Sequence, residues 1–237
     1  ALRMTARLKR AVRDAAYRAS VELAGERGSF PLFDRDEYLS RPFIRRLPAD
    51  IRKGIARHGI RNGCLLSDAP TGTTSIYIGN LSSGIEPIFA FSYTRNVLQP
   101  DGSKVATTII DPTFMLYCST NGLDPRDPAV MEGLPEFMVT AETLSVREHV
   151  MTQAVCQHYV DSCLSKTVNC PEDMTFEAFK DVYLLAYRTR CKGITTYRPN
   201  EVTGSVLTVS KQEPKQPGID ASHAAAGPAR PPVTTKL

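Results

Sequence analysis

The feature that most constrains the fold is a short apolar segment that leads directly into a turn of small, hydroxyl-bearing residues. Cys64–Ser67 are predicted to form a short buried strand, and a helix is predicted to begin inside Thr73–Ile78. The turn between them contains Pro70, Thr71, Gly72, Thr73, Thr74 and Ser75. A strand, a turn and a helix in this order, alternating along the chain, indicate an α/β fold.

This turn has the chemistry of an anion-binding site. Gly72 allows a ligand to approach the backbone closely, and its neighbours supply hydroxyl donors. The helix that follows would direct its free N–H groups and the positive end of its dipole at the same point, where a phosphate is the simplest ligand. The lysine of a Walker P-loop is missing, so ATP hydrolysis is not implied. Spacing alone leaves a second interpretation open, namely an ordinary helix cap with nothing bound.

The remaining elements follow from periodicity, caps and turns. A capping box at Ser145–Glu148 opens one helix, and Gly59 suits a left-handed position after another. The predicted helices cover residues 3–26, Ala49–His58, 145 to about 164, and Phe176–Arg190. The predicted strands cover 88–98 and 103–110, joined as a hairpin by the turn at Gln99–Gly102, and Ile194–Tyr197.

The first predicted helix is basic at its start. The first thirteen residues hold five basic residues and no acidic one, which is also compatible with an organelle transit peptide. We prefer an amphipathic helix with a basic outer face, because apolar residues recur at helical spacing. These residues are Leu8, Val12, Ala15, Ala19 and Leu23.

Composition divides the chain in two. Residues 1–200 form the predicted ordered part, whereas residues 201–237 contain five prolines and no aromatic residue. A segment of this kind buries little apolar surface, so we predict a disordered C-terminal tail.

Charge and hydropathy exclude several partners. The formal net charge of +4 is mild for a protein dedicated to duplex nucleic acid, so no nucleic-acid partner is expected. No apolar run is long enough to span a membrane, and no secretory segment is present, so no membrane partner is expected. Six cysteines without Cys-x-x-Cys spacing are interpreted as free thiols, which predicts a cytoplasmic protein.

Cys156, Cys163 and Cys170 recur every seven residues, and the first two would share one face of a helix. A metal or redox cluster is one interpretation, with His149 or His158 as a further ligand. Small buried side chains are the interpretation that we favour, because the ligand spacing is wrong for a metal.

A polar stripe lies on the same predicted helix. His149, Gln153, Gln157 and Asp161 are four residues apart, which suits a solvated or buried network as well as a contact surface for a polar ligand or partner. The sequence does not separate these two accounts. It contains no Ser-His-Asp, His-Glu-x-x-His or paired-carboxylate arrangement, so no complete active site is displayed.

Several segments together resemble the C-terminal part of the adenosylcobalamin-dependent (class II) ribonucleotide reductases. The segments are APTGTTSIYIGNLSSGIEPIFAFSYTR, HVMTQAVCQHYVDSCLSKTVNCP, CKGITTYRPN, AYRASVELAGERGSFPLF and GIRNGCLL. They occur in order over residues 1 to about 200. The SSGIEP and SKT-x-N wording is more similar to the cobalamin class than to the iron-dependent class.

The resemblance implies a fold, a site and a reaction. The fold would be the C-terminal part of a ten-stranded α/β barrel of ribonucleotide reductase type. The loop Pro70–Ser75 would hold the phosphates of a ribonucleoside diphosphate or triphosphate substrate. The reaction would convert ribonucleotides to deoxyribonucleotides with adenosylcobalamin as cofactor and an external dithiol as reductant.

The chain also departs from the family pattern. The family's radical cysteine lies in an Asn-x-Cys-x-Glu segment that this sequence lacks, and residues 201–237 contain no cysteine. We therefore expect a small subunit of a split enzyme, or a fragment, that is not active alone. A larger catalytic reductase subunit would carry the radical cysteine and bind most of the cobalamin. Two alternatives stay open: a non-catalytic accessory or regulatory subunit that affects assembly, and an independent phosphate-binding module.

Overall fold

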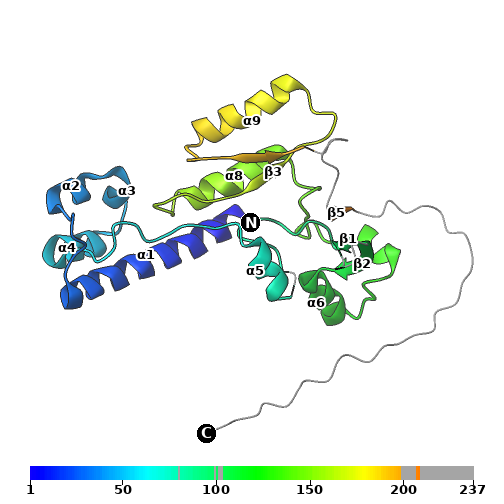
Figure 1. Ribbon diagram of the computed structural model, residues 1–237, viewed down its shortest axis with the longest axis horizontal. Helices are drawn as coiled ribbons and strands as arrows, with labels where there is room; N and C mark the ends of the chain where they lie inside the picture. Colours follow the sequence, from blue (N-terminus) through cyan, green and yellow to red (C-terminus); the bar gives the residue numbers. More distant parts are fainter. Residues whose placement is uncertain (80, 99, 101–103, 199–206, 209–237) are drawn as a thin grey trace, which may run out of the picture.

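The computed structural model describes residues 1–79, 81–98, 100, 104–198 and 207–208. Its longest element, α1 (Leu2–Arg27), runs from the N-terminus near the centre of Figure 1 toward the left side and confirms the first predicted helix. Three helices cover the C-terminal end of α1, namely α2 (Arg35–Ser40), α3 (Pro42–Arg45) and α4 (Ala49–His58). Of these, only α4 was predicted from the sequence.

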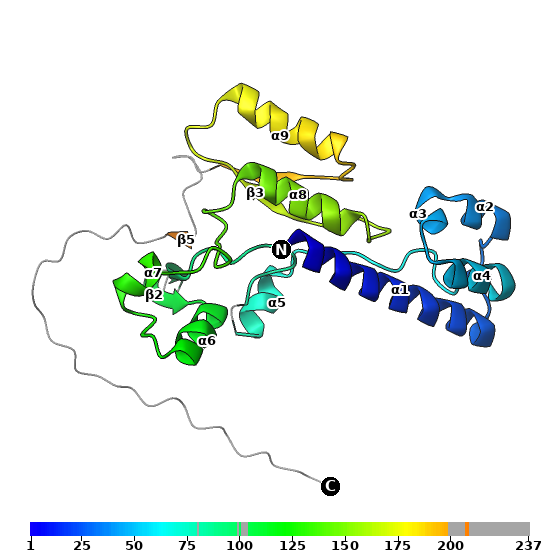
Figure 2. The same ribbon diagram turned by 180° about the vertical axis from the view of Figure 1, so that it is seen from behind.

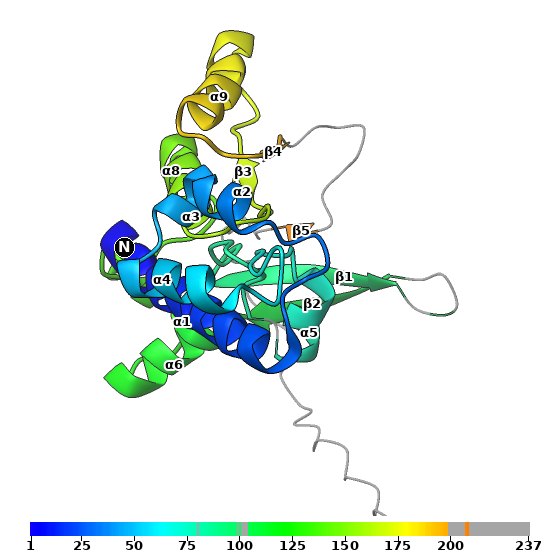
Figure 3. The ribbon, with the colours of Figure 1, turned by 90° about the vertical axis from the view of Figure 1, so that its left-hand side faces the viewer.

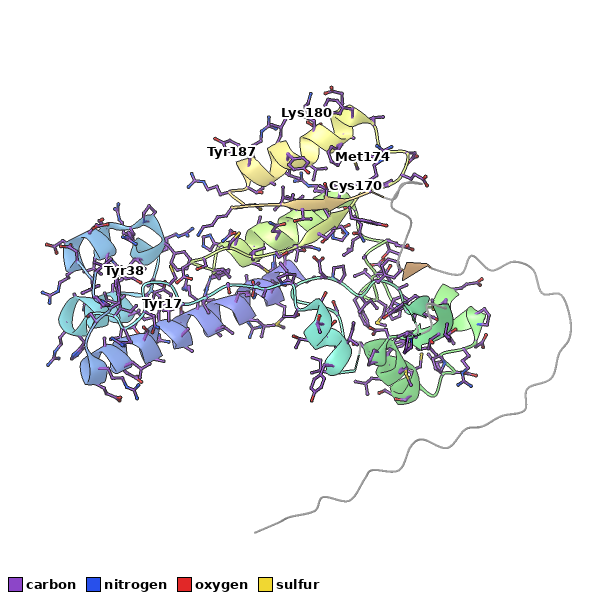
Figure 4. The ribbon with its side chains drawn as sticks, in the orientation of Figure 1. Tyr17, Tyr38, Cys170, Met174, Lys180 and Tyr187 are labelled. Carbon is purple, nitrogen blue, oxygen red and sulfur yellow. The ribbon has the colours of Figure 1, made fainter. Side chains whose placement is uncertain are left out.

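These four helices share one apolar core. Figure 4 shows Tyr17 of α1 and Tyr38 of α2 lying between the helices that carry them. Gly59 ends α4 with a positive φ of 76°, and a Cβ there would lie 1.9 Å from Ser29 Oγ, so a glycine is required. The buried members of the core, hereafter the helical core, are Tyr17, Val21, Tyr38, Ile44, Leu47, Ile51, Ile55 and Ile60.

The burial of α1 differs from the prediction. The buried positions are Arg13, Tyr17, Ser20, Val21 and Ala24, and the predicted apolar stripe lies on the other side. Leu8, Val12 and Leu23 are 61%, 55% and 38% exposed, and Ala15 and Ala19 are exposed as well. The expected burial of this apolar stripe is therefore wrong, because α4 and α8 pack against the tyrosine side of α1 instead. The basic residues Arg3, Arg7 and Arg10 are exposed, as predicted.

A second layer lies above α1. Helix α8 (Val146–Gln157) packs between α1 and the pair formed by β3 (Thr167–Asn169) and α9 (Phe176–Arg188), as Figure 2 shows from behind. Strand β4 (Thr195–Tyr197) pairs with β3 in parallel, and α9 is the crossover between them. In Figure 4, Cys170 and Met174 lie toward the β3 side of α9, whereas Lys180 and Tyr187 project away from it.

The predicted hairpin is confirmed. Strands β1 (Ser92–Leu98) and β2 (Lys104–Ile110) are antiparallel, with Ser92 opposite Ile110 and Leu98 opposite Lys104. Figure 3 shows the hairpin extending away from the helices. Most of its turn, at residues 99 and 101–103, lies outside the described residues. Helices α6 (Pro112–Asn121) and α7 (Pro128–Glu132) follow, and Phe91, Phe114 and Cys118 form the small buried core on this side.

The described residues form two separate sheets, with orders β2-β1-β5 and β3-β4, and these sheets do not close into a barrel. The mixed helix and sheet content agrees with the expected α/β class. Of the predicted tail at residues 201–237, the structure describes only β5 (Leu207–Thr208), which pairs with β1. The other tail residues lie outside the description, so their disorder stays a prediction.

Two predicted elements differ from the structure. Cys64–Ser67 do not form a buried strand, and only the adjacent Asp68 makes an isolated parallel bridge, to Leu164. Their backbone donors are used elsewhere, as described below. Helix α8 ends at Gln157 rather than near residue 164, because the Gln157 amide donates to the carbonyls of Val160 and Ser162 beyond the helix end.

Candidate functional site

The six predicted phosphate-binding residues lie together at the start of α5 (Gly72–Tyr77), a short helix beside α6 in Figure 1. The helix begins at Gly72, one residue before the predicted range, which is within the usual uncertainty of helix ends. Pro70, Gly72, Thr73 and Thr74 are exposed, and Thr71 and Ser75 are half-buried. The structure therefore places the segment, hereafter the phosphate loop, at the surface of the described residues.

Hydrogen bonds within the loop leave part of its donors available. The Gly72 N–H donates to the Pro70 carbonyl at 2.7 Å, and the Ser75 hydroxyl donates to the Gly72 carbonyl at 2.7 Å. Thr73 and Thr74 lie in the first helical turn, where backbone N–H groups have no intrahelical acceptor. Their exposed hydroxyls and N–H groups are suited to an incoming anion.

Gly72 faces open space. A Cβ built on Gly72 would meet no atom within 4 Å. Gly72 also does not have a positive φ, so its backbone conformation is open to residues with a side chain. Nothing in the chain itself therefore requires a glycine at this position. The backbone at Gly72 is therefore exposed, and its close approach by a ligand stays a prediction.

The turn Ser82–Glu86, which was not predicted, contacts the phosphate loop. Its Gly84 N–H donates to the Thr71 hydroxyl at 2.8 Å. Gly84 has a φ of 57°, and a Cβ there would lie 2.7 Å from the Ala69 carbonyl oxygen. The turn is closed by a hydrogen bond from Glu86 N to the Ser83 carbonyl at 2.9 Å and by one from the Ser82 hydroxyl to the Glu86 carbonyl. The Ser-Ser-Gly motif was a visible signal for such a turn.

Asp161 fixes the segment that leads into the loop. Its carboxylate accepts the backbone N–H groups of Leu65 and Leu66, both at 2.8 Å, which explains why no strand pairs there. The Tyr17 hydroxyl donates to the same carboxylate at 2.7 Å. Burial, and then this hydrogen bond, raise the pKa of Tyr17, so the phenol stays protonated.

An ion pair lies immediately before the loop. The Lys9 ammonium on α1 contacts the Asp68 carboxylate, and their side chains are 24% and 16% exposed. The backbone carbonyl of Asp68 also accepts a hydrogen bond from the Ser165 N–H at 2.9 Å. The approach to the loop is thus held from α1 and from the segment before β3.

The polar stripe is a buried network over most of its length. His149 and Gln153 are fully buried and Gln157 is nearly so, while Asp161 lies beyond the end of α8. His149 Nε2 lies 3.1 Å from the Ala141 carbonyl, and the Gln153 amide donates to the Gly193 carbonyl. Burial and the nearby Lys166 ammonium lower the pKa of His149, which favours a neutral imidazole.

The cysteines form no metal site. Cys156 and Cys170 are buried, and burial raises the pKa of both thiols. Cys163 is exposed and lies outside α8, so the expectation that it shares a helix face with Cys156 is wrong. No group of three potential ligands that could hold a metal ion occurs among the residues that the structure describes.

A separate cavity of about 310 Å³ lies at the ends of β3 and β4. It meets the N-terminal end of α8 at Ser145 and Val146 and is bordered by Glu142 and Glu172. Pockets for drug-sized ligands span roughly 300–1,000 Å³. The cavity is therefore at the lower limit of what encloses a small molecule.

No helix in the described part of the chain has the length and apolarity that crossing a bilayer requires.

Comparison with known proteins gives these features a context. Residues 1–197 match the family described as the ribonucleotide reductase barrel domain. This chain belongs to that family. It is 33% identical over 219 residues to a vitamin B12-dependent ribonucleoside-diphosphate reductase of Thermoplasma acidophilum, covering 87% of this chain and 26% of that protein.

Further relatives are also named as ribonucleoside-diphosphate reductases. A vitamin B12-dependent ribonucleoside-diphosphate reductase of Mycobacterium tuberculosis is 32% identical over 230 residues, covering 90% of this chain and 29% of the relative. A ribonucleoside-diphosphate reductase subunit alpha of Treponema pallidum is 25% identical over 189 residues, covering 76% of this chain and 19% of that protein. The reductase-barrel chain thus spans less than a third of the length of each of these relatives.

Proposed function

We propose that this chain is the C-terminal part, or small subunit, of an adenosylcobalamin-dependent ribonucleotide reductase that converts ribonucleotides to deoxyribonucleotides. Membership of the reductase barrel family supports this proposal, as do relatives named as vitamin B12-dependent reductases. In the complete enzyme, β3 and β4 would join further strands in a ten-stranded α/β barrel.

The phosphate loop would hold the diphosphate or triphosphate of the substrate. The observation that carries this proposal is the exposed first turn of α5, where Gly72 leaves the backbone open and Thr73 and Thr74 present hydroxyl and N–H donors. Holding the phosphates there would fix the ribose in one orientation. Orientation of this kind lowers the barrier by converting an encounter into a unimolecular step.

A larger subunit would supply what this chain lacks. The Asn-x-Cys-x-Glu segment of the family is absent from residues 1–237, so the radical cysteine would belong to the partner. The exposed apolar residues Leu8 and Val12 of α1 support a need for a partner, because an isolated protein gains stability by covering such surface. The chain alone would be inactive.

The cavity at the ends of β3 and β4 is too small to enclose adenosylcobalamin. The cavity of about 310 Å³ is small even for a drug-sized ligand, and a corrin ring with its nucleotide is larger. We therefore propose that the partner binds most of the cofactor. Replacement of the ribose 2′-hydroxyl by hydrogen consumes two electrons, which an external dithiol would provide on oxidation to a disulfide.

The test is reconstitution. Ribonucleotide reduction would be assayed with adenosylcobalamin and a dithiol, using the cysteine-bearing subunit with and without this chain. Activity in the mixture alone is the expected result. Equal activity without the chain would favour the alternative, a non-catalytic accessory or regulatory subunit that affects assembly.

A double substitution sharpens the same assay. Leu8→Glu with Val12→Glu would charge the exposed stripe of α1 without touching its buried positions. We expect this variant to remain folded and to lose reconstitution. Exchanging Arg3 and Arg7, which are also exposed on α1, for glutamate is the matched control, since it changes charge without removing apolar surface.

A further inference from the structure

A buried lysine connects the second layer to the turn beside the phosphate loop. The Lys166 side chain is 1% exposed and lies just before β3. Its ammonium donates to Glu86 Oε2 at 2.7 Å, to His149 Nδ1 at 2.9 Å and to the Thr167 carbonyl at 3.2 Å. An ammonium has three donors, so all of them are used.

The two side chains that accept from Lys166 are also fully engaged. Glu86 Oε1 accepts the Thr167 N–H, which joins the turn Ser82–Glu86 to the first residue of β3. Because His149 Nδ1 accepts from Lys166, the ring proton is on Nε2, where it donates to the Ala141 carbonyl. The network is satisfied throughout, which makes it rigid.

The network continues from Glu86 to the phosphate loop. Glu86 closes the turn that contains Gly84, and the Gly84 N–H holds the Thr71 hydroxyl at 2.8 Å. Gly84 also sits so close to the Ala69 carbonyl that even a methyl group would not fit. Any displacement of Glu86 is thereby transmitted to Ala69 and Thr71.

We propose that Lys166, through Glu86, is a positioning residue for the phosphate loop. The proposal rests on the proposed function, because it concerns how that same loop is held. Lys166 does not touch the loop residues. It sets the place of the turn Ser82–Glu86, against which the loop packs, and so orients the donors of Thr73 and Thr74.

Hydrogen–deuterium exchange on the full chain tests this proposal directly. We expect Lys166→Met to raise amide exchange over residues 69–79 and 82–86 at least tenfold while leaving α1 and α4 unchanged. The matched control is Lys180→Met, which removes a lysine from an exposed ion pair with Glu177 and should change nothing in the loop. Exchange that rises only in α8 and β3 would overturn the proposal, since it would indicate a purely local structural role.

A second variant covers the case in which Lys166→Met does not fold. Glu86→Gln keeps one accepting oxygen but replaces the other by an amide N–H2 donor, so it can accept from Lys166 or from Thr167 but not from both, and it removes the carboxylate charge. It should raise exchange in the same segment by a smaller factor, and unchanged exchange would overturn the proposal. Gly84→Ala should loosen the loop without altering the lysine network, since Gly84 lies at its other end.

The nucleotide arm of the experiment separates the two proposals. A ribonucleoside diphosphate added to the unchanged chain with its larger subunit should protect the amides of Thr73 and Thr74 from exchange. If this protection is absent while Lys166→Met still loosens the loop, the positioning proposal stands and phosphate binding fails. If protection occurs and Lys166→Met leaves the loop unchanged, the reverse holds.

Discussion

The helical core and the segment Pro70–Glu86 differ in what holds them in place. In the helical core, which four helices and the loop after α4 share, side chains such as Tyr17, Ile55 and Ile60 are fully buried. The phosphate loop has no fully buried residue, and the Gly84 N–H of the turn Ser82–Glu86 donates a hydrogen bond to its Thr71 hydroxyl. The difference suggests that this chain separates stability from ligand contact, as binding loops on rigid scaffolds commonly do.

The largest effect is expected in the helical core. Ile55→Ala removes a fully buried side chain of α4 and should lower the free energy of unfolding by about 2 to 5 kcal/mol. Denaturant unfolding followed by circular dichroism measures this loss. Ile76→Ala, at an exposed position on α5, is the control and should be close to neutral. Equal losses in both variants would contradict the comparison.

Asp161 links the two regions, so its substitution should have an intermediate effect. Asp161→Asn replaces one accepting oxygen by a donor and disturbs the bonds from Leu65, Leu66 and Tyr17. Hydrogen bonds to charged groups contribute about 1.5 to 3 kcal/mol to stability, so we expect the free energy of unfolding to fall by this amount. The measurement is again denaturant unfolding, and Tyr17→Phe should produce a smaller loss because it removes only one of these bonds. A neutral Asp161→Asn would show that the carboxylate does not hold the segment.

The phosphate loop should show the opposite behaviour, with affinity changed and stability kept. Gly72→Val places a branched side chain in open space, so the free energy of unfolding should change by no more than about 0.5 kcal/mol. In the reconstituted enzyme we expect KM for the ribonucleotide to rise about tenfold, or about 1.4 kcal/mol. Gly72→Ala is the graded control and should have a smaller effect. Unchanged kinetics in both variants would remove the loop from substrate binding.

The smallest effect concerns pH. The pKa of His149 is lowered from its ordinary value of 6.5 by burial and by Lys166. Between the folded and unfolded pKa values the unfolded chain binds more protons, so this contribution to stability is present above pH 6.5 and declines as pH falls below it.

His158 provides the comparison for this prediction. Its pKa is lowered in the same direction, by partial burial and by Arg46, but its side chain is exposed. Stability is expected to fall as the pH drops below 6.5. His149→Gln should therefore remove more of this loss of stability than His158→Gln does. Thermal unfolding measured from pH 5 to 8 tests this, and equal slopes for the two variants would count against a special role of the buried imidazole.

Local signals predicted much of the fold. Periodicity and caps located α1, α4, α8 and α9, and the turn residues located the hairpin. Helix α6 was not predicted, although Asp111 caps it and Gly122 ends it in a left-handed conformation. Packing between distant segments could not be predicted, because periodicity alone does not determine which side of α1 its neighbours cover.

The phosphate-binding role of the loop stays a prediction, and it rests on the same kind of local signal. The residues of the phosphate loop and the openness of Gly72 follow from local composition. The role of Gly84 depends on the distance to the Ala69 carbonyl, and that of Lys166 on a contact with Glu86, eighty residues earlier in the chain. Contacts of this kind exist only after folding, so no spacing rule displays them.

The Tyr17–Asp161 hydrogen bond has a consequence for the order of folding. It joins residues 144 positions apart, whereas the helical core is built within the first sixty residues. Closing a long loop costs more entropy than closing a short one, so nearby contacts form first. During synthesis the N-terminal helices are therefore expected to assemble early, with Tyr17 still lacking its acceptor. The phosphate loop would reach its final place only after Asp161 and Lys166 have emerged from the ribosome.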